Sequence, residues 1–219
     1  AACLWIDDVN LDRAKQVPSI ARRLDAVVKM RSASKKNQTK QAASTPHRFG
    51  EIRHQSSDFT IVVPRVSSEN RDFLPVDLVR GGTIIGDRNF ALYDAPIWNM
   101  ALIASRLHWV WIGTVCVRMR TDFSYSNTLG WNTFPVPKLT EKNKDDLTRC
   151  AEDILLAREA HFPATIADLY KPDIMPDDLR HAHDRNDEVL ERIYVGRRFK
   201  NDTERLEKLF ELYTKMSVG

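Results

Sequence analysis

The tripeptide Pro135-Val136-Pro137 divides the sequence into two parts of different character. Proline lacks a backbone N–H and restricts the residue before it, so neither a helix nor a strand continues through such a segment. Before the tripeptide, β-branched and glycine-punctuated stretches alternate with irregular ones. After it, apolar residues recur at helical spacing. We therefore predict two domains, residues 1–137 and residues 138–219.

Short strands are predicted in the first domain. The β-branched run Phe59-Thr60-Ile61-Val62-Val63 is closed by Pro64, which is typical of a buried strand. Further short strands are expected at Thr83–Ile85 and Phe90–Tyr93, where glycines interrupt the chain. Residues 119–134 mix basic, aromatic and amide side chains without periodicity, which indicates long loops and short strands.

Helices are also predicted in this domain. One begins near Asp12 and is interrupted or restarted at Pro18, and another begins at Pro96, since proline suits the first helical position. A strand through His108–Val117 is the alternative for the later part of the second helix, and periodicity does not decide between them. Residues 32–45 are polar and rich in small side chains, which predicts a loop or a frayed helix end.

The second domain is predicted to be helical throughout. Apolar stripes occur within residues 147–155, 175–193 and 201–213, each surrounded by charged residues. The fold class expected from the whole sequence is α+β. A mixed α/β domain with short strands and long loops is followed by a small all-helical domain.

The composition excludes several classes of protein. No apolar run approaches the roughly 18 residues that a membrane-spanning helix needs. The first residues do not form a signal peptide, because no basic region precedes a long apolar stretch. The three cysteines are too few and too scattered for a disulfide framework. We expect a cytoplasmic chain without a membrane partner.

Basic residues are concentrated in the first domain. Residues 1–137 hold 18 Lys and Arg against 12 Asp and Glu, whereas residues 138–219 hold 15 against 18. Eight basic residues and one acid lie between Arg22 and Arg48. Such a stretch attracts polyanions, because each neutralised phosphate releases counterions. A solvated basic helix and loop is the alternative explanation.

Known catalytic motifs are missing from the sequence. It contains neither a glycine-rich turn for S-adenosylmethionine nor a phosphate-binding loop. Asn132-Thr133-Phe134-Pro135 has the wrong residue order for the catalytic loop of amino-methyltransferases. His181 and His183 diverge on a helix, which makes a shared metal ion difficult and predicts surface histidines. We predict a non-enzymatic chain without catalytic or metal-binding residues.

The first domain does contain side chains suited to reading DNA bases. Arginine donates two hydrogen bonds to guanine, asparagine can read adenine, and a carboxylate accepts from cytosine. Arg120-Thr121-Asp122 is the most suggestive triplet, because in an extended segment its first and third side chains project to the same side. They could then reach both members of one G·C pair. The alternative is a local ion pair on a loop.

The order of several motifs resembles the C-terminal part of the MmeI-like (Type IIL) restriction-modification enzymes. The most specific strings are PRVSSENR at residues 64–71 and YSNT at residues 125–128, followed by WNTFPVP at residues 131–137. Tyr93-Asp94-Ala95-Pro96 and Leu155-Leu156-Ala157-Arg158-Glu159 also match the family. The resemblance runs nearly from end to end.

The resemblance implies a role within a longer enzyme. Members of this family carry an endonuclease, an adenine-N6 methyltransferase and one target recognition domain in a single polypeptide. The catalytic motifs lie upstream of the part that this chain resembles. S-adenosylmethionine and Mg²⁺ are therefore expected only in upstream domains of a parent methyltransferase, with or without a fused endonuclease. The expected partners are double-stranded DNA and those upstream domains.

The resemblance also places specificity positions on this sequence. A pair just before the YSNT string sets one outer base of the target in the family, and it falls on Arg120 and Asp122. A basic residue followed by an acidic one goes with guanine there. Other specificity positions fall near Arg65 and the 87–89 loop. The predicted base-reading residues are Arg65, Asp87, Arg88, Asn89, Arg118, Arg120 and Asp122. The predicted phosphate contacts are Arg31, Lys35, Lys36, Lys40, Arg71, Ser124, Tyr125, Ser126 and Asn127.

Sequence-specific recognition of double-stranded DNA is therefore the predicted function. The first alternative is an assembly module, in which the acidic helical part docks on other domains and reads no bases. A weaker alternative is an independent nuclease, which Mg²⁺-dependent cleavage by the chain would reveal.

Overall fold

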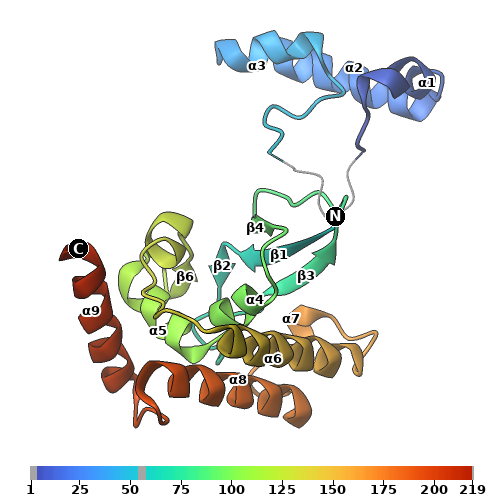
Figure 1. Cartoon of the computed structure of the whole chain (residues 1–219). Coiled ribbons are helices and arrows are strands. Elements are labelled where there is room, and N and C mark those ends of the chain that lie inside the picture. Colours follow the sequence, from blue (N-terminus) through green and yellow to red (C-terminus); the bar gives the residue numbers. More distant parts are fainter. Residues whose placement is uncertain (1–3, 54–57, 219) are drawn as a thin grey trace. The chain divides into compact units, whose positions relative to one another are not determined.

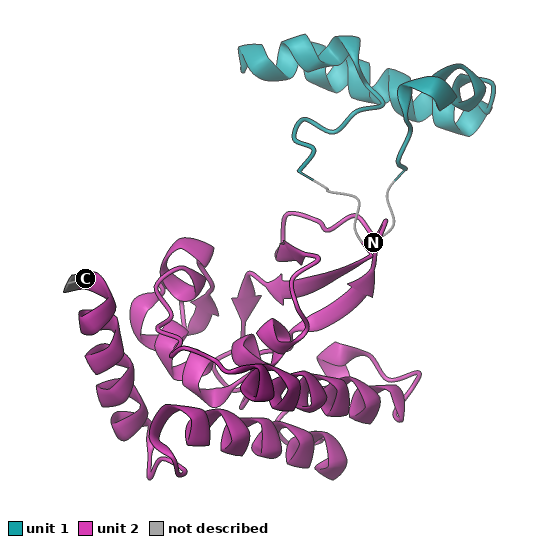
Figure 2. Ribbon diagram, in the orientation of Figure 1, with its two compact units in different colours: residues 1–54 teal, residues 55–219 magenta. Residues whose placement is uncertain are grey.

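The computed structural model describes residues 4–53 and 58–218, which belong to two compact units (Figure 2). Unit 1 comprises residues Ala1–His54 and unit 2 comprises residues Gln55–Gly219. The predicted boundary at Pro137 lies inside unit 2. No helix among the described residues combines the length and the apolar character that crossing a bilayer requires.

Unit 1 is built from short helical segments. The longest helix, α2, begins at Pro18, which occupies its first turn as the sequence predicts. The helix α3 and the 3₁₀ turn η2 lie in the stretch predicted as a loop or frayed helix end, and both pack against α2. The elements of unit 1 are η1 (Asp8–Asn10), α1 (Leu11–Lys15), α2 (Pro18–Ser32), α3 (Asn37–Gln41) and η2 (Ala42–Ser44).

Unit 2 contains two three-stranded antiparallel sheets. In the first, β1 (Phe59–Pro64) lies between β3 (Asp77–Arg80) and β4 (Asn89–Tyr93). Ile61 of β1 pairs with Leu78 on one side and Leu92 on the other. The strand predicted at residues 59–63 is confirmed, but the one predicted at Thr83–Ile85 is wrong, because that segment forms no ladder. The second sheet has β6 (Asp122–Ser124) between β2 (Val66–Ser67) and β5 (Arg118–Met119).

Two consecutive helices, α4 (Trp98–Ile103) and α5 (Arg106–Val115), occupy the segment after Pro96. The single predicted helix is interrupted at Ser105, whose hydroxyl accepts a hydrogen bond from His108 N at 3.2 Å and caps α5. The alternative of a strand through residues 108–117 is wrong, because helical hydrogen bonding continues to Val115.

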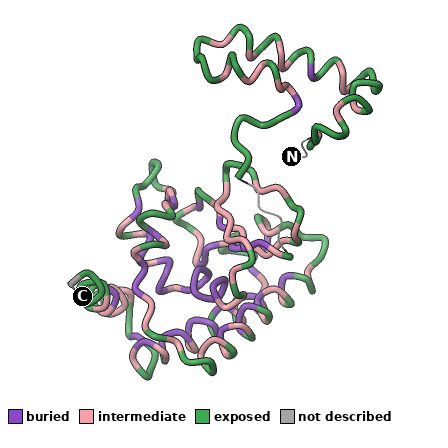
Figure 3. The backbone as a smooth tube through the Cα atoms, turned by 45° about the horizontal axis from the view of Figure 1, so that its top comes forward, coloured by how far each residue is buried: buried purple, intermediate pink, exposed green. Residues whose placement is uncertain are grey.

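The predicted C-terminal helices are present and pack on the rest of unit 2. They are α6 (Glu141–Glu159), α7 (Ile166–Leu169), α8 (Asp177–Val195) and α9 (Asp202–Val218). Helix α6 lies between α4 and α8, and α9 packs on α5 (Figure 1). The buried side chains form one core that extends from Ile61 to Leu209 (Figure 3). The α+β fold class is confirmed, but the packing does not separate at Pro137.

Ion pairs tie α8 to α9 and α9 to α5. Glu191 is fully buried and accepts hydrogen bonds from Arg205 Nε at 2.8 Å and Phe199 N at 2.9 Å. Arg106 at the start of α5 forms an ion pair of 2.6 Å with Asp202. Its backbone N–H donates to Asp187 Oδ1 at 2.7 Å, and burial raises the pKa of that carboxyl to about 7. These contacts fix α5, whose Trp109 packs against Phe123 of the second sheet.

Candidate nucleic-acid interface

Arg65 connects the two sheets of unit 2 at the point where β1 passes into β2. Its backbone N–H donates to Arg88 O at 3.0 Å, and its carbonyl accepts from Tyr125 N at 2.8 Å. These bonds bring the 87–89 turn and the end of β6 to opposite sides of Arg65. Segments far apart in the sequence therefore meet here, as the predicted function requires.

The Arg65 guanidinium is exposed but held in place. Its Nη1 donates to the backbone carbonyl of Asp87 at 3.1 Å, and its Cζ lies 5.1 Å from the centre of the Phe90 ring. Ring and carbonyl together limit the rotamers that this arginine can adopt. Phe90 is not among the residues predicted for this site. Phe90 lies two residues after Arg88 in a predicted strand, and this position could have indicated that its ring lies near the site.

The side chains of the 87–89 turn have no bonding partner among the residues that the structure describes. Asp87 and Arg88 are exposed, and Asn89 is half-buried at the start of β4. A carboxylate, a guanidinium and an amide are thus adjacent and free to bind a ligand. These are the groups that read cytosine, guanine and adenine edges.

Arg120 and Thr121 form the two-residue turn between β5 and β6. Met119 pairs directly with Asp122, and the φ angle of Arg120 is +62°. Two-residue hairpin turns require this left-handed conformation, so the extended geometry expected for the triplet is wrong at Arg120. Arg120 is exposed and Asp122 is half-buried. No ion pair joins them, and neither side chain bonds another described residue.

Arg118 differs from the other candidate readers because its side chain forms an ion pair within the protein. Its Nη1 donates to Glu69 Oε2 at 2.8 Å and to Thr121 O at 3.3 Å. Its Cζ also lies 4.5 Å from the centre of the Phe123 ring, which belongs to the core. Arg118 therefore fastens the hairpin to the loop after β2. Sequence reasoning missed Glu69, although it lies within the PRVSSENR string.

The residues of the YSNT string divide into buried and accessible ones. The Tyr125 side chain is only 5% exposed, its hydroxyl lies 3.1 Å from His108 Nε2, and burial raises its pKa. Tyr125 therefore belongs to the core, and its side chain is not accessible to a phosphate. Ser126 Oγ accepts from Leu129 N at 3.3 Å and caps η3 (Asn127–Trp131). Ser124 is half-buried and Asn127 is exposed.

Arg71, another predicted phosphate contact, is half-buried at the end of the PRVSSENR string. Its Nη1 lies 3.5 Å from Ser67 Oγ, at the limit of a hydrogen bond. Because Ser67 is buried in β2, this contact directs Arg71 along the second sheet. A phosphate role for Arg71 stays a prediction.

Among the candidate phosphate contacts of unit 1, one is used internally. Arg31 donates from Nη1 to Ala42 O at 2.7 Å and to Thr45 O at 2.9 Å, and from Nη2 to Arg48 O at 2.7 Å. These three backbone carbonyls already bind the Arg31 guanidinium, and a phosphate contact from Arg31 stays a prediction.

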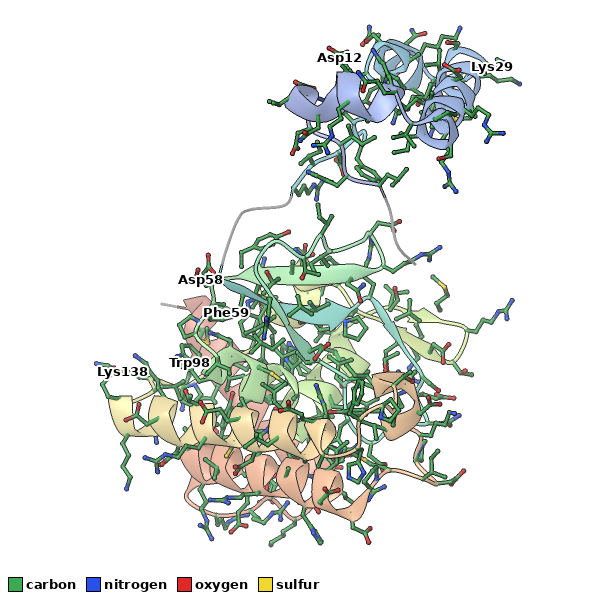
Figure 4. All side chains as sticks on the ribbon, turned by 90° about the vertical axis from the view of Figure 1, so that its right-hand side faces the viewer. Asp12, Lys29, Asp58, Phe59, Trp98 and Lys138 are labelled. Carbon is green, nitrogen blue, oxygen red and sulfur yellow. The ribbon has the colours of Figure 1, made fainter. Side chains whose placement is uncertain are left out.

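The lysines of unit 1 are more accessible. Lys35, Lys36 and Lys40 are exposed, and their ammonium groups pair with no acid among residues 4–53 or 58–218. Lys29 also projects outward from α2 (Figure 4). Together they leave positive charge in solvent, where a polyanion could bind.

No group suited to metal binding occurs among the described residues, where three or more His, Cys, Asp or Glu side chains never converge. His183, predicted at the surface, is fully buried, and its Nε2 lies 2.7 Å from the Tyr170 hydroxyl. Burial lowers the pKa of His183 well below its ordinary value, so the imidazole is neutral and serves packing.

Two family models match consecutive parts of the chain. Residues 1–138 match the family model "MmeI, target recognition domain", and residues 139–219 match "MmeI, C-terminal domain". The chain is 37% identical over 215 residues to "DNA methyltransferase A" of Bacillus subtilis (strain 168), covering 98% of this chain and 24% of that protein.

A solved structure of the Type IIL restriction-modification enzyme MmeI in complex with DNA superimposes with a TM-score of 0.92 at 30% identity. The match covers 99% of this chain and 29% of that one. The chain therefore spans about a quarter of the length of the relatives it matches. Both family models together account for the full sequence, as the PRVSSENR and YSNT strings suggested. The chain belongs to the MmeI family and comprises its target recognition domain and its C-terminal domain.

Proposed function

We propose that this chain selects the DNA site of a larger adenine-N6 methyltransferase by reading base edges in the major groove. The carrying observation is the convergence of base-reading side chains without ion-pair partners among the described residues at the second sheet of unit 2. Arg65 and the 87–89 turn lie beside the end of β6, while Arg120 and Asp122 lie at its beginning.

The dimensions of the sheet suit this role. The major groove is about 12 Å wide and admits a two-stranded β-ribbon such as β5–β6. A strand rises about 3.3 Å per residue, so Asp122 is roughly 7 Å from Ser124 along β6. That separation corresponds to about two base-pair steps of about 3.4 Å. The two groups of readers can therefore address different base pairs of one site.

Other basic and polar side chains contact the DNA phosphates, independently of the base sequence. Lys35, Lys36 and Lys40 of unit 1 supply positive charge to phosphates, and Arg71 does so near the second sheet. Ser124, Ser126 and Asn127 donate hydrogen bonds to phosphate oxygens there. Arg118 holds the hairpin in place through Glu69 and does not read bases itself.

The chemistry is carried out elsewhere in the polypeptide. The relatives are about four times longer than this chain, which leaves room for a methyltransferase domain and an endonuclease domain upstream. We place S-adenosylmethionine and Mg²⁺ in those domains and the whole enzyme in the cytoplasm. The recognition chain directs methylation, and cleavage where a nuclease is active, to an asymmetric site.

Exchanging the two hairpin charges tests the proposal. The double variant Arg120→Asp with Asp122→Arg should change the preferred base at one position of a site selected from random duplexes. The expected change in discrimination is about 1–3 kcal/mol, the contribution of one good bidentate contact. Aspartate tolerates a positive φ angle better than most residues, so the turn should fold as before.

A matched exchange in α6, Arg149→Asp with Asp146→Arg, reverses an exposed charge pair away from the second sheet and should leave every base preference unchanged. Identical preferences in the hairpin exchange and the wild-type chain would contradict the assignment of Arg120 and Asp122. A chain that binds no random duplex even at low salt would instead favour the assembly-module alternative.

A further inference from the structure

The outer face of the second sheet carries large apolar side chains that nothing among the described residues covers. Val117 is 72% exposed, Met119 is 58% exposed and Val66 is 40% exposed. Among described residues 58–137, the one other large hydrophobic side chain that is exposed is Leu129, in η3, which follows β6 closely. Exposed apolar side chains in this part of unit 2 are thus confined to one region.

Strand register places these side chains beside the predicted readers. Residues directly opposite each other in an antiparallel ladder share a face, so Met119 lies beside Asp122 and Val66 beside Ser124. Ser124 N donates to Val117 O at 3.0 Å, which extends the pairing of β6 with β5 by one residue.

The other face of the same strands points into the protein. Phe123 of β6 is buried, and its partner Arg118 lies against the Phe123 ring. Since side chains alternate along a strand, Val117 and Met119 both project to the side opposite Arg118. The outer face therefore carries apolar groups on β2 and at β5, with Asp122 and Ser124 of β6 between them.

Charge and position identify the partner of this surface. Arg120 and Arg88 flank the sheet without acidic partners among the described residues, which favours a phosphate-bearing partner over an apolar protein surface. On duplex DNA, the apolar group displayed in the major groove is the C5-methyl of thymine. Opposite residues have Cα atoms about 5 Å apart, so Met119 reaches a base adjacent to the one that Asp122 reads.

We propose that Met119 and Val117 recognise the C5-methyl group of thymine next to the base pair read by Arg120 and Asp122. This inference rests on the proposed function and deepens it, because it adds an apolar specificity element to the polar ones. The same surface accepts 5-methylcytosine, whose methyl group occupies the same place in the groove.

The test removes single methyl groups from the DNA. The full chain first selects its preferred duplex, and each thymine of that duplex is then replaced in turn by deoxyuridine. Wild-type chain should lose about fourfold in affinity at one or two thymines, the effect of one buried methyl group. Met119→Gln or Val117→Asn, which nearly keep side-chain size and remove the apolar contact, should bind the thymine and uracil duplexes equally at the affected position.

Met216→Ala in α9 is the matched control, because Met216 is 59% exposed and lies outside the second sheet. It should retain the full sensitivity to uracil. Wild-type chain that selects a sequence but tolerates uracil at every thymine would overturn the inference and leave the proposed function intact. Unchanged sensitivity to uracil in both the Met119 and the Val117 variant would overturn the inference as well. Failure to select any sequence would instead contradict the proposed function.

Discussion

Unit 1 and unit 2 both carry many charged residues, but their charges have different surroundings. In unit 2, Glu191 and Arg158 are buried and the Arg205 side chain is only 12% exposed, and each is bonded to a partner far away in the sequence. In the described part of unit 1, Leu24 and His47 are the buried residues, and Lys35, Lys36 and Lys40 lie in solvent without acidic partners. A count of charges along the sequence does not separate these situations.

This difference assigns the charges to different tasks. A buried ion pair fixes which elements pack together, since leaving one member alone in the core costs several kcal/mol. An exposed lysine without a partner adds little to stability but retains its full interaction with phosphate. We infer that the charges of unit 2 mainly specify the fold and that those of unit 1 supply affinity for DNA.

Breaking the ion pairs at Glu191 should have the largest effect. Glu191→Ala removes the buried acceptor of Arg205 and Phe199 N, and we expect it to lower the free energy of unfolding by about 3–5 kcal/mol. Glu188→Ala removes an exposed pair with Arg192 in the same helix and should cost less than about 0.5 kcal/mol. Urea unfolding of both variants measures these losses. Equal losses would show that the buried and the exposed ion pair contribute equally to stability.

Neutralising the lysines of unit 1 tests the other half of the comparison. If Lys35, Lys36 and Lys40 each contact a phosphate, replacing all three with alanine should weaken DNA binding by about a hundredfold at physiological salt. The slope of log K against log salt should fall by about 2.7, while base preference and unfolding free energy stay the same. Titration at several salt concentrations measures the slope.

A triple variant in the C-terminal helices provides the charge-matched control. Lys144, Lys208 and Lys215 pair with glutamates, and their replacement by alanine changes the net charge equally. Their loss should alter the salt slope little. A similar fall in slope for both triples would show that net charge, and not the position of unit 1's lysines, sets the affinity.

The deep core of unit 2 also makes its stability depend on pH. Burial lowers the pKa of His108 from 6.5 to about 3, so below pH 6.5 the unfolded chain binds a proton that the folded chain does not. Stability from this group is fully present above pH 6.5 and is lost as the pH falls. At pH 5 the loss amounts to about 2 kcal/mol.

The pKa of Asp187 is raised to about 7, so this group shifts stability in the opposite direction over the same pH range. Comparing the wild-type chain with His108→Gln isolates the contribution of His108. The variant should be less stable than wild type at pH 7.5, and the gap should shrink by about 2 kcal/mol at pH 5. Urea unfolding at the two pH values measures the gap. A gap independent of pH would mean that His108 is protonated in the folded chain.

Local patterns in the sequence were sufficient for much of the fold. The β-branched run at residues 59–63 and the apolar stripes after Pro137 predicted β1 and the long helices, because each pattern repeats at the period of its element. Pro137 stops regular structure, but stopping a helix does not separate a core. The C-terminal helices bury their stripes against α4 and α5, which only the tertiary packing reveals.

The site was predicted less completely, because polar residue types do not reveal their partners. Tyr125 sits in the polar YSNT string, yet its ring is in the core beside His108. Arg31 is satisfied by carbonyls 11 to 17 residues away, and Arg118 by an acid 49 residues away. Arg120 lacks the usual glycine or asparagine signal of a left-handed turn, so its hairpin was not foreseen.

The smallest expected effect separates two arginines of the same hairpin. Arg118→Gln removes the bond to Glu69 and the contact with the Phe123 ring, and it should cost about 1 kcal/mol of stability because the pair is partly exposed. Its effect on binding should be uniform across base positions, since a looser hairpin weakens every contact made from it. Arg120→Gln should leave stability within about 0.5 kcal/mol of wild type, because its side chain has no described partner to lose.

Unfolding curves and base-by-base selection on the two variants measure stability and base preference. Loss of preference at a single position in Arg118→Gln would show that this arginine leaves Glu69 to read a base, and pairing within the protein would then no longer distinguish the charges of the fold from those of the DNA interface.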